Sequence, residues 1–181
     1  MRDEADSGGS AAERLAAVGA AAEAELAEEA RQMALQYLGA RDRTERELRD
    51  RLKRRGCAPA AIEAALERLV AARLVDDEAL ARRYVEVRMS ERPAGAIRLA
   101  QDLRRRGVDR GIVDRVLEEY ADRIGTDAAA LDLLRRVSKR YRGLDSTTAR
   151  RRMYGMLARR GFDPETTARA VETAWREMEG T

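Results

Sequence analysis

The sequence predicts an all-α protein made of three tandem three-helix repeats that form an elongated, curved helical array. A pattern of leucine, three mostly basic residues and glycine occurs three times, with apolar residues at helical spacing on both sides. The composition agrees with this fold. Aromatic residues make up only 4% of the chain and charged residues 38%, which favours a thin core made by helix-on-helix packing, and three prolines leave long stretches free to be helical. Each trio is too small to stand on much core of its own, so neighbouring trios are expected to stabilise one another.

The three copies of the pattern span residues 52–56, 103–107 and 157–161, about 50 residues apart, which leaves room for three ordinary helices and their turns. An apolar residue precedes each leucine by four positions, and another directly follows each glycine. These flanking residues are Leu48, Leu99, Met153, Cys57, Val108 and Phe162. We expect the leucines to be buried and each glycine to end its helix in a left-handed C-cap.

The first repeat is expected to span residues 30–75, with a first helix from Ala30 to Leu38. Thr44 and Glu47 form a capping box at the start of the second helix. Pro59 suits the first turn of the third helix.

The second repeat is expected to span residues 76–124. Asp76 and Asp77 invite a metal-site interpretation, but an N-cap followed by acids at the positive end of the helix dipole explains them better. We expect the middle helix to begin near Pro93 and Ala94, and Asp109 to cap the third helix.

The third repeat is expected to span residues 125–181. Its first helix places Ala130, Leu133, Leu134, Val137 and Tyr141 on one face. The middle helix is expected over residues 147–160, and the last helix starts at residues 163–164.

Residues 1–29 form an acidic tail rich in alanine and glutamate, which we expect to be disordered or loosely helical. Residues 1–30 contain eight acids and two bases, so this segment carries −6 and the rest +9, for a total of +3. The tail is either a solvated extension or an arm that docks on the basic surface of the protein until a partner displaces it.

Composition argues against catalysis. The chain has no histidine and one cysteine, which excludes Ser-His and Cys-His nucleophile pairs and His-containing zinc sets. Cys57 takes the apolar position after a repeat glycine, so we interpret it as a core residue. No phosphate-binding Gly-x-x-x-x-Gly-Lys motif and no membrane-length apolar run occurs. We therefore predict a non-enzymatic, cytoplasmic protein without metal or cofactor.

Basic residues concentrate on the predicted middle helix of every repeat. Cations at a helix C-terminus complement the dipole, and a coding bias towards arginine would also raise their number, but neither explains three arginines near a helix start at residues 150–152. We predict a surface for an anionic partner. Its candidate contact residues are Arg43, Arg46, Arg54, Arg55, Arg98, Arg104, Arg105, Arg106, Arg136, Lys139, Arg140, Arg150, Arg151, Arg152 and Arg159.

The third helices are poor readers of base edges, because residues 59–69 expose Glu63, Glu67 and Arg68 and lack Asn and Gln. Contact with a phosphate backbone or with an acidic protein groove fits better than sequence-specific readout.

The residues of the first two repeats resemble the RecX family. The resemblance rests on Arg43-Thr44, Glu47-Leu48, Leu52 and Gly56, followed by residues 74–78, Ala81 and Tyr84, and on Arg98-Leu99, Leu103 and Gly107-Val108. It implies a monomeric regulator of RecA recombinase in recombination, DNA repair and the SOS response. Such a protein binds the RecA filament on single-stranded DNA, with weak direct DNA binding, and inhibits filament growth, ATPase and strand exchange.

Two other functions fit the residues. A stand-alone, sequence-independent DNA-binding protein would follow from the net charge of +9 outside the tail. A helical scaffold for another acidic protein would need only the repeat architecture.

Overall fold

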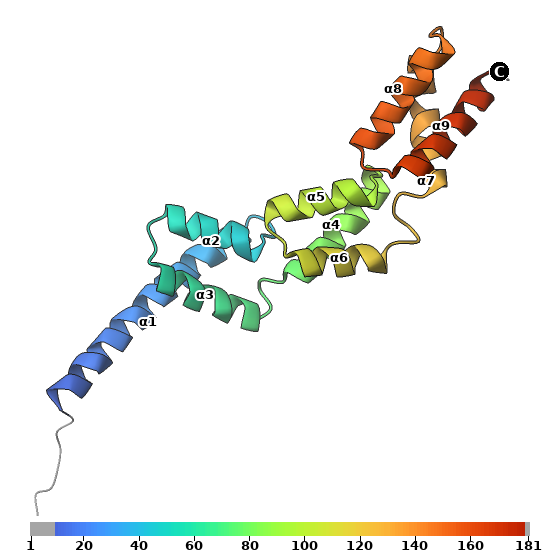
Figure 1. The fold of residues 1–181 in the computed structure, drawn as a ribbon. Coiled ribbons are helices and arrows are strands. Elements are labelled where there is room, and N and C mark those ends of the chain that lie inside the picture. The colour runs from blue at the N-terminus through green and yellow to red at the C-terminus, as the bar shows by residue number, and fades with distance from the viewer. Residues whose placement is uncertain (1–9, 180–181) are drawn as a thin grey trace, which may run out of the picture. The chain divides into compact units, whose positions relative to one another are not determined.

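The structure is a computed structural model that describes residues 10–179, and this part of the chain is helical with turns and no strand (Figure 1). The elements in chain order are α1 (Ala11–Leu38), α2 (Glu45–Arg54), α3 (Pro59–Ala71), α4 (Asp77–Glu91), α5 (Ala96–Arg106), α6 (Arg110–Glu119), α7 (Asp127–Val137), the 3₁₀ turn η1 (Ser138–Arg140), α8 (Ser146–Arg159) and α9 (Pro164–Glu179). They belong to two compact units, one ending at Asp76 and the other beginning at Asp77. The prediction of an all-α protein of three-helix repeats is confirmed.

Each helix trio encloses its own apolar core. The buried residues of the three cores include Leu48, Leu52, Ile62, Leu66 and Leu69 in the first, Leu80, Val85, Leu99, Leu103, Val113 and Val116 in the second, and Leu133, Leu134, Met153, Leu157, Phe162 and Trp175 in the third. Cys57 is half-buried and packs against the first core, as its apolar position predicts.

The recurring pattern is a Schellman motif. In the first copy the N–H of Gly56 donates to the Lys53 carbonyl at 3.0 Å, and the N–H of Cys57 donates to the Leu52 carbonyl at 3.2 Å. The same two bonds occur around Gly107 and Gly161, and all three glycines have left-handed φ angles of 79° to 91°. The motif requires glycine at the turn and favours apolar contact across it, which explains the spacing of leucine, glycine and the next residue.

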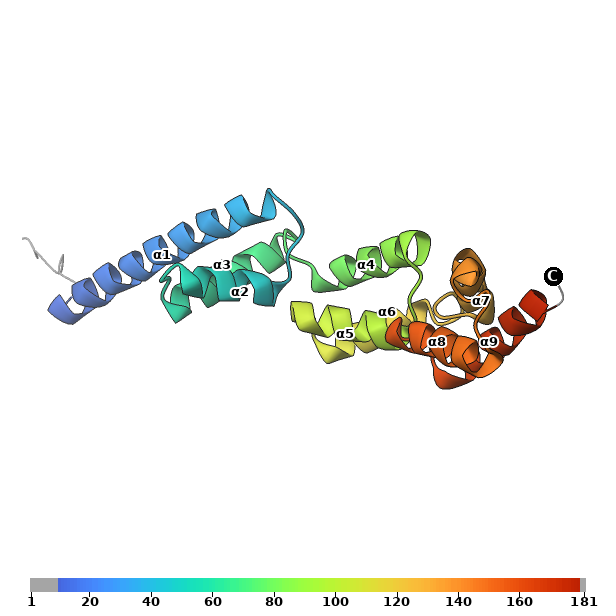
Figure 2. The same ribbon diagram turned by 90° about the horizontal axis from the view of Figure 1, so that it is seen from above.

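The first helix begins well before residue 30, where the sequence places the start of the first repeat. Ser10 and Glu13 form a capping box, and α1 then continues without interruption to Leu38. Its C-terminal half lies beside α3 (Figure 2). The two helices pack through small side chains, since Ala30, Ala61 and Ala65 form one buried cluster. Its N-terminal half is exposed, and residues 1–9 of the predicted tail lie outside the described residues.

Side-chain caps start most of the other helices. Thr44 is fully buried and forms the predicted capping box with Glu47, with a 3.1 Å bond from the Glu47 N–H to the threonine hydroxyl. Asp109 caps α6, and Asp145 caps α8. The start of α5 differs from the prediction, because Gly95 takes the N-cap position and the helix begins at Ala96.

Gly95 also joins the second repeat to the third within the second unit. Its N–H donates a 2.9 Å hydrogen bond to the carbonyl of Arg160, which is the C-cap residue of α8. The Arg160 guanidinium donates at 3.4 Å to the carbonyl of Pro93. The turn between α4 and α5 therefore lies directly against the end of α8.

Candidate nucleic-acid interface

The candidate cations lie mostly on α2, α5, α8 and the end of α7, but their surroundings divide them into two classes. Some are bound to other protein groups and help hold the fold. Others are exposed and have side chains without a protein partner.

The second repeat holds most of its candidate cations in ion pairs. Asp102 accepts from Arg98 at 3.0 Å and lies 3.7 Å from Arg105. Arg104 pairs with Asp114 of α6 at 3.1 Å, and Arg106 also interacts with another group of the protein. These contacts offset much of the positive charge on α5.

Two candidates of the first repeat are engaged with other protein groups, and one of them links neighbouring segments. The Arg43 guanidinium donates to the Tyr37 carbonyl at 3.1 Å and lies over the ring of that tyrosine. Arg46 lies 4.0 Å from Asp50, one turn along α2. Arg43 therefore fastens the end of α1 to the turn before α2.

Arg150 belongs to the packing of α8 on α9. Its guanidinium donates to Glu172 at 2.8 Å and lies 5.7 Å from the ring centroid of the buried Trp175. The three arginines near the start of α8 therefore differ, because Arg150 is engaged with α9 whereas Arg151 and Arg152 are exposed. Arg136 pairs with Asp132 at 2.6 Å.

Seven candidates are exposed, and within residues 10–179 their side chains make no hydrogen bond, ion pair or ring contact with protein. They are Arg54, Arg55, Lys139, Arg140, Arg151, Arg152 and Arg159. Two lie at the end of α2 and five in the third repeat. Unengaged guanidinium groups can contact an anionic partner without first breaking an internal ion pair.

Arg92 and Arg160 are not among the cations selected from the sequence pattern. Both lie beside the junction of the second and third repeats, although they are far apart in the chain. Arg160 belongs to the repeated pattern, whereas Arg92 lies outside it, in the turn that follows α4. The Pro-Ala-Gly sequence after Arg92 marks a turn but does not say which segment that turn contacts.

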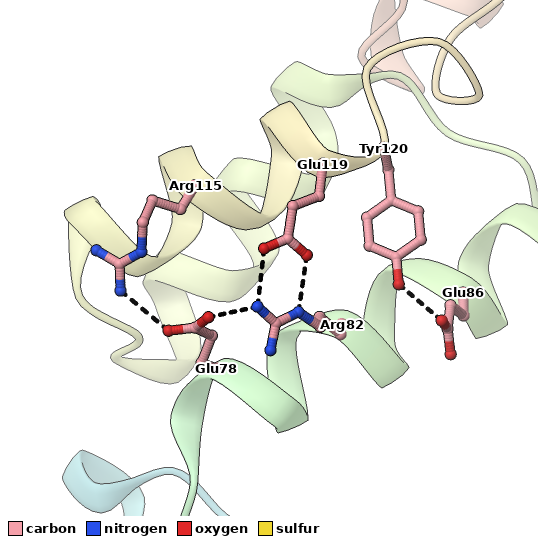
Figure 3. A network of polar contacts seen from close by, with 6 residues as sticks. All are labelled: Glu78, Arg82, Glu86, Arg115, Glu119 and Tyr120. Atoms are coloured by element: carbon pink, nitrogen blue, oxygen red, sulfur yellow. Dashed lines mark hydrogen bonds and ion pairs between the residues drawn. The ribbon is translucent and has the colours of Figure 1, made fainter.

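The carboxylates of α4 and α6 form an ion-pair network with arginines (Figure 3). Arg82 donates to both oxygens of Glu119, at 2.7 and 2.8 Å. Glu78 accepts from Arg115 at 3.0 Å and from Arg82, and these bonds hold the pKa of Glu78 below its ordinary value. Glu78 therefore acts in the structure as an ion-pair partner that ties α4 to α6.

Residues 10–179 contain no group of three or more His, Cys, Asp or Glu side chains placed to hold a metal ion. Within the same residues, no helix is long and apolar enough to cross a membrane.

Comparison with known families matches each helix trio separately. Residues 30–69 match the first three-helix domain of RecX, residues 76–117 the second and residues 126–171 the third.

Individual relatives agree over most of the chain. The chain is 34% identical to Regulatory protein RecX of Prosthecochloris aestuarii over 140 residues, which cover 77% of this chain and 89% of the relative. It is 35% identical to Regulatory protein RecX of Streptomyces lividans over 150 residues, covering 83% of this chain and 79% of the relative.

Two solved structures share the fold. The crystal structure of RecX from Lactobacillus salivarius has a TM-score of 0.71 at 22% identity and covers 87% of this chain and 99% of its own. A second structure of regulatory protein RecX has a TM-score of 0.72 at 24% identity, covering 88% and 76%. With three matched domains and relatives above 30% identity, the chain belongs to the RecX family of regulatory proteins.

Proposed function

We propose that this protein regulates homologous recombination and DNA repair by binding the RecA–DNA filament and inhibiting its growth, ATPase and strand exchange. Family membership supports a regulator. The observation that supports an anionic filament as the partner is the set of seven exposed cations whose side chains have no partner within residues 10–179, at the end of α2 and in the third repeat.

Binding by several small patches suits a repetitive partner. Each exposed cation contributes little by itself, because it makes a solvent-screened contact. Patches carried on one chain act at high effective concentration once the first patch is bound, so their combined affinity exceeds that of any one of them. A filament offers the repeated sites that this mode of binding needs.

We infer that the protein acts as a monomer in the cytoplasm, by occupancy and not by catalysis. Glu78 and Glu119, the carboxylates of the network between α4 and α6, are engaged with arginines. The half-buried Cys57 packs against a core and has no histidine in the chain to activate it.

The experiment is a titration of RecA's single-strand-dependent ATPase with substoichiometric protein. The proposal expects ATP hydrolysis to slow at ratios well below one protein per RecA subunit. Unchanged hydrolysis at every ratio, with binding to the filament also absent in a pull-down, would rule it out.

The alternative function is stand-alone, sequence-independent DNA binding, which the charge of +9 outside the first 30 residues favours. A salt titration of DNA binding without RecA separates the two functions. Tight binding that falls steeply with salt would favour the alternative, whereas weak binding combined with strong ATPase inhibition would favour filament regulation.

A further inference from the structure

A cleft of about 360 Å³ lies at the junction of the second and third repeats, within the second unit. Four arginines line it: Arg92 from the turn after α4, and Arg136, Arg140 and Arg160 from the third repeat. Glu91 is the one carboxylate among the lining residues, and the buried Tyr141 contributes to the wall. We call this site the junction cleft.

Backbone contacts between the repeats assemble the junction cleft. The bond from the Gly95 N–H to the Arg160 carbonyl places the turn that carries Arg92 against the end of α8. The Arg160 guanidinium also reaches the Pro93 carbonyl. Neither repeat alone contains the four cations, so the site exists only where the two repeats meet.

The cations of the junction cleft are poorly neutralised by protein groups. Arg136 pairs with Asp132, and Arg160 meets only a carbonyl at 3.4 Å. In the described part of the chain, the side chains of Arg92 and Arg140 have no hydrogen-bonding or ionic partner. Like charges gathered in this way repel one another, and a bound anion would relieve that repulsion.

Helix ends explain part of this arrangement. Arg92 follows the end of α4, Arg136 lies in the last turn of α7, and Arg160 caps α8, so each complements a helix dipole. The dipoles account for one cation at each helix end. They do not account for the meeting of three such ends, together with Arg140, around a single cleft.

We propose that the junction cleft binds the phosphodiester backbone of a nucleic-acid strand, with guanidinium groups from both repeats on the same strand. One carboxylate of an acidic protein is satisfied by one or two guanidiniums. A strand brings successive phosphates, and its sugars and bases can lie on the apolar part of the lining, which includes the half-buried Val137 and Met156. The site concerns the chain's own contact with nucleic acid, so it does not depend on regulation of a filament.

The test is fluorescence anisotropy with a labelled single-stranded oligothymidylate at low salt, without RecA. Arg140→Glu is compared with Arg142→Glu, because the two residues are two positions apart, both are exposed and both variants change the charge equally, but only Arg140 lines the cleft. Arg92→Glu makes the same change on the other side of the cleft. Circular dichroism and the thermal midpoint verify that each variant is folded.

We expect Arg140→Glu and Arg92→Glu each to weaken binding at least about tenfold, and Arg142→Glu less than about threefold. The milder Arg92→Gln and Arg140→Gln variants should each lower the slope of log affinity against log salt by about 0.7, the value for one phosphate contact on a single strand. Competition with polyglutamate of matched charge should displace the oligonucleotide poorly.

Equal losses in all three charge-reversal variants would overturn the proposal, because they would reflect only the general field of the protein. A loss at Arg140 without a loss at Arg92 would overturn it as well, since the site needs both repeats. Preferential binding of polyglutamate would reassign the cleft to an acidic protein, and an absence of oligonucleotide binding at low salt would leave no phosphate site.

Discussion

Gly95 and Gly161 approach so closely that a Cβ atom on Gly95 would lie 2.0 Å from the Gly161 carbonyl oxygen. A Cβ on Gly161 would in turn lie 2.3 Å from the backbone nitrogen of Arg98. The last glycine of the repeated pattern therefore has two roles, because it ends α8 and lets the second and third repeats meet backbone to backbone.

Replacing Gly95 by alanine should destabilise the second unit by about 2 kcal/mol or more, since rigid backbone atoms must move to admit the methyl group. Gly155→Ala is the matched control within α8. Its Cβ would meet only the flexible end of Arg159, at 3.2 Å, and alanine is the better helix former. Urea denaturation followed by circular dichroism should show a loss for the first variant and a gain of up to about 1 kcal/mol for the second. Equal stability of the two variants would contradict the close approach.

The repeat glycines should differ in their tolerance of alanine. Gly56 has a φ of 85° and open space around its Cβ position, so Gly56→Ala should cost only the left-handed strain of about 1–2 kcal/mol. Gly161→Ala adds the clash with Arg98 to the same strain and should cost more. Thermal unfolding of both variants tests this order, and a larger loss at Gly56 would refute it.

Loss of the Thr44 hydroxyl should destabilise the first unit by about 1–2 kcal/mol, because Thr44→Ala removes the acceptor for the Glu47 N–H in a fully buried cap. Thr44→Ser retains the hydroxyl and serves as the control. Urea midpoints measure the effect. Serine and alanine variants of equal stability would show that the buried methyl group matters and the cap does not.

Reversing unengaged cations should reduce inhibition of RecA without unfolding the protein. The double variant Arg151→Glu/Arg152→Glu should raise the concentration for half-maximal ATPase suppression at least about tenfold, because both side chains are exposed and make no hydrogen bond, ion pair or ring contact in the described part of the chain. Arg110→Glu/Arg176→Glu makes the same charge change on the third helices, where both arginines are exposed, and should have a much smaller effect. Equal effects of the two double variants would argue against a localised contact surface.

The network of α4 and α6 should make stability depend on pH in the acid range. Hydrogen bonds from Arg115 and Arg82 lower the pKa of Glu78 in the folded state. In the unfolded chain the pKa of a glutamate is about 4.3, so as the pH falls the unfolded chain takes up this proton before the folded protein does. The contribution of Glu78 is therefore complete above about pH 5 and is lost as the pH falls towards the lowered folded pKa. Glu78→Gln should flatten the fall in thermal midpoint between pH 5 and 3 at low salt. An unchanged slope would show that this ion pair is uncoupled from folding.

Local sequence patterns predict most of the fold. The leucine and glycine spacing predicts buried leucines and left-handed helix ends, because both follow from contacts a few residues apart along the chain. The capping box of Thr44 is equally local. The start of α5 differs by a few residues because Gly95 makes a bond to the distant Arg160, which no nearby residue signals.

The candidate surface is harder to predict because its members differ in their long-range partners. Arg150 and Arg151 are adjacent and chemically identical, yet only Arg150 meets Glu172 and Trp175 of α9. Charge patterning identifies cationic helices, whereas tertiary packing decides which cations are left for another molecule. The approach of Arg92 to the third repeat has the same cause, since it follows from packing between repeats.

The Schellman motif constrains the leucine, the glycine and the residue after it, but it uses only backbone atoms of the three residues between leucine and glycine. The backbone bonds of the motif therefore form whatever side chains stand at those three positions. Some of these side chains have other contacts, such as the pair of Arg104 with Asp114, but Arg54, Arg55 and Arg159 have no hydrogen-bonding or ionic side-chain partner within residues 10–179. An engineer could replace these three with neutral residues and change the charge of the first and third turns on an unchanged backbone.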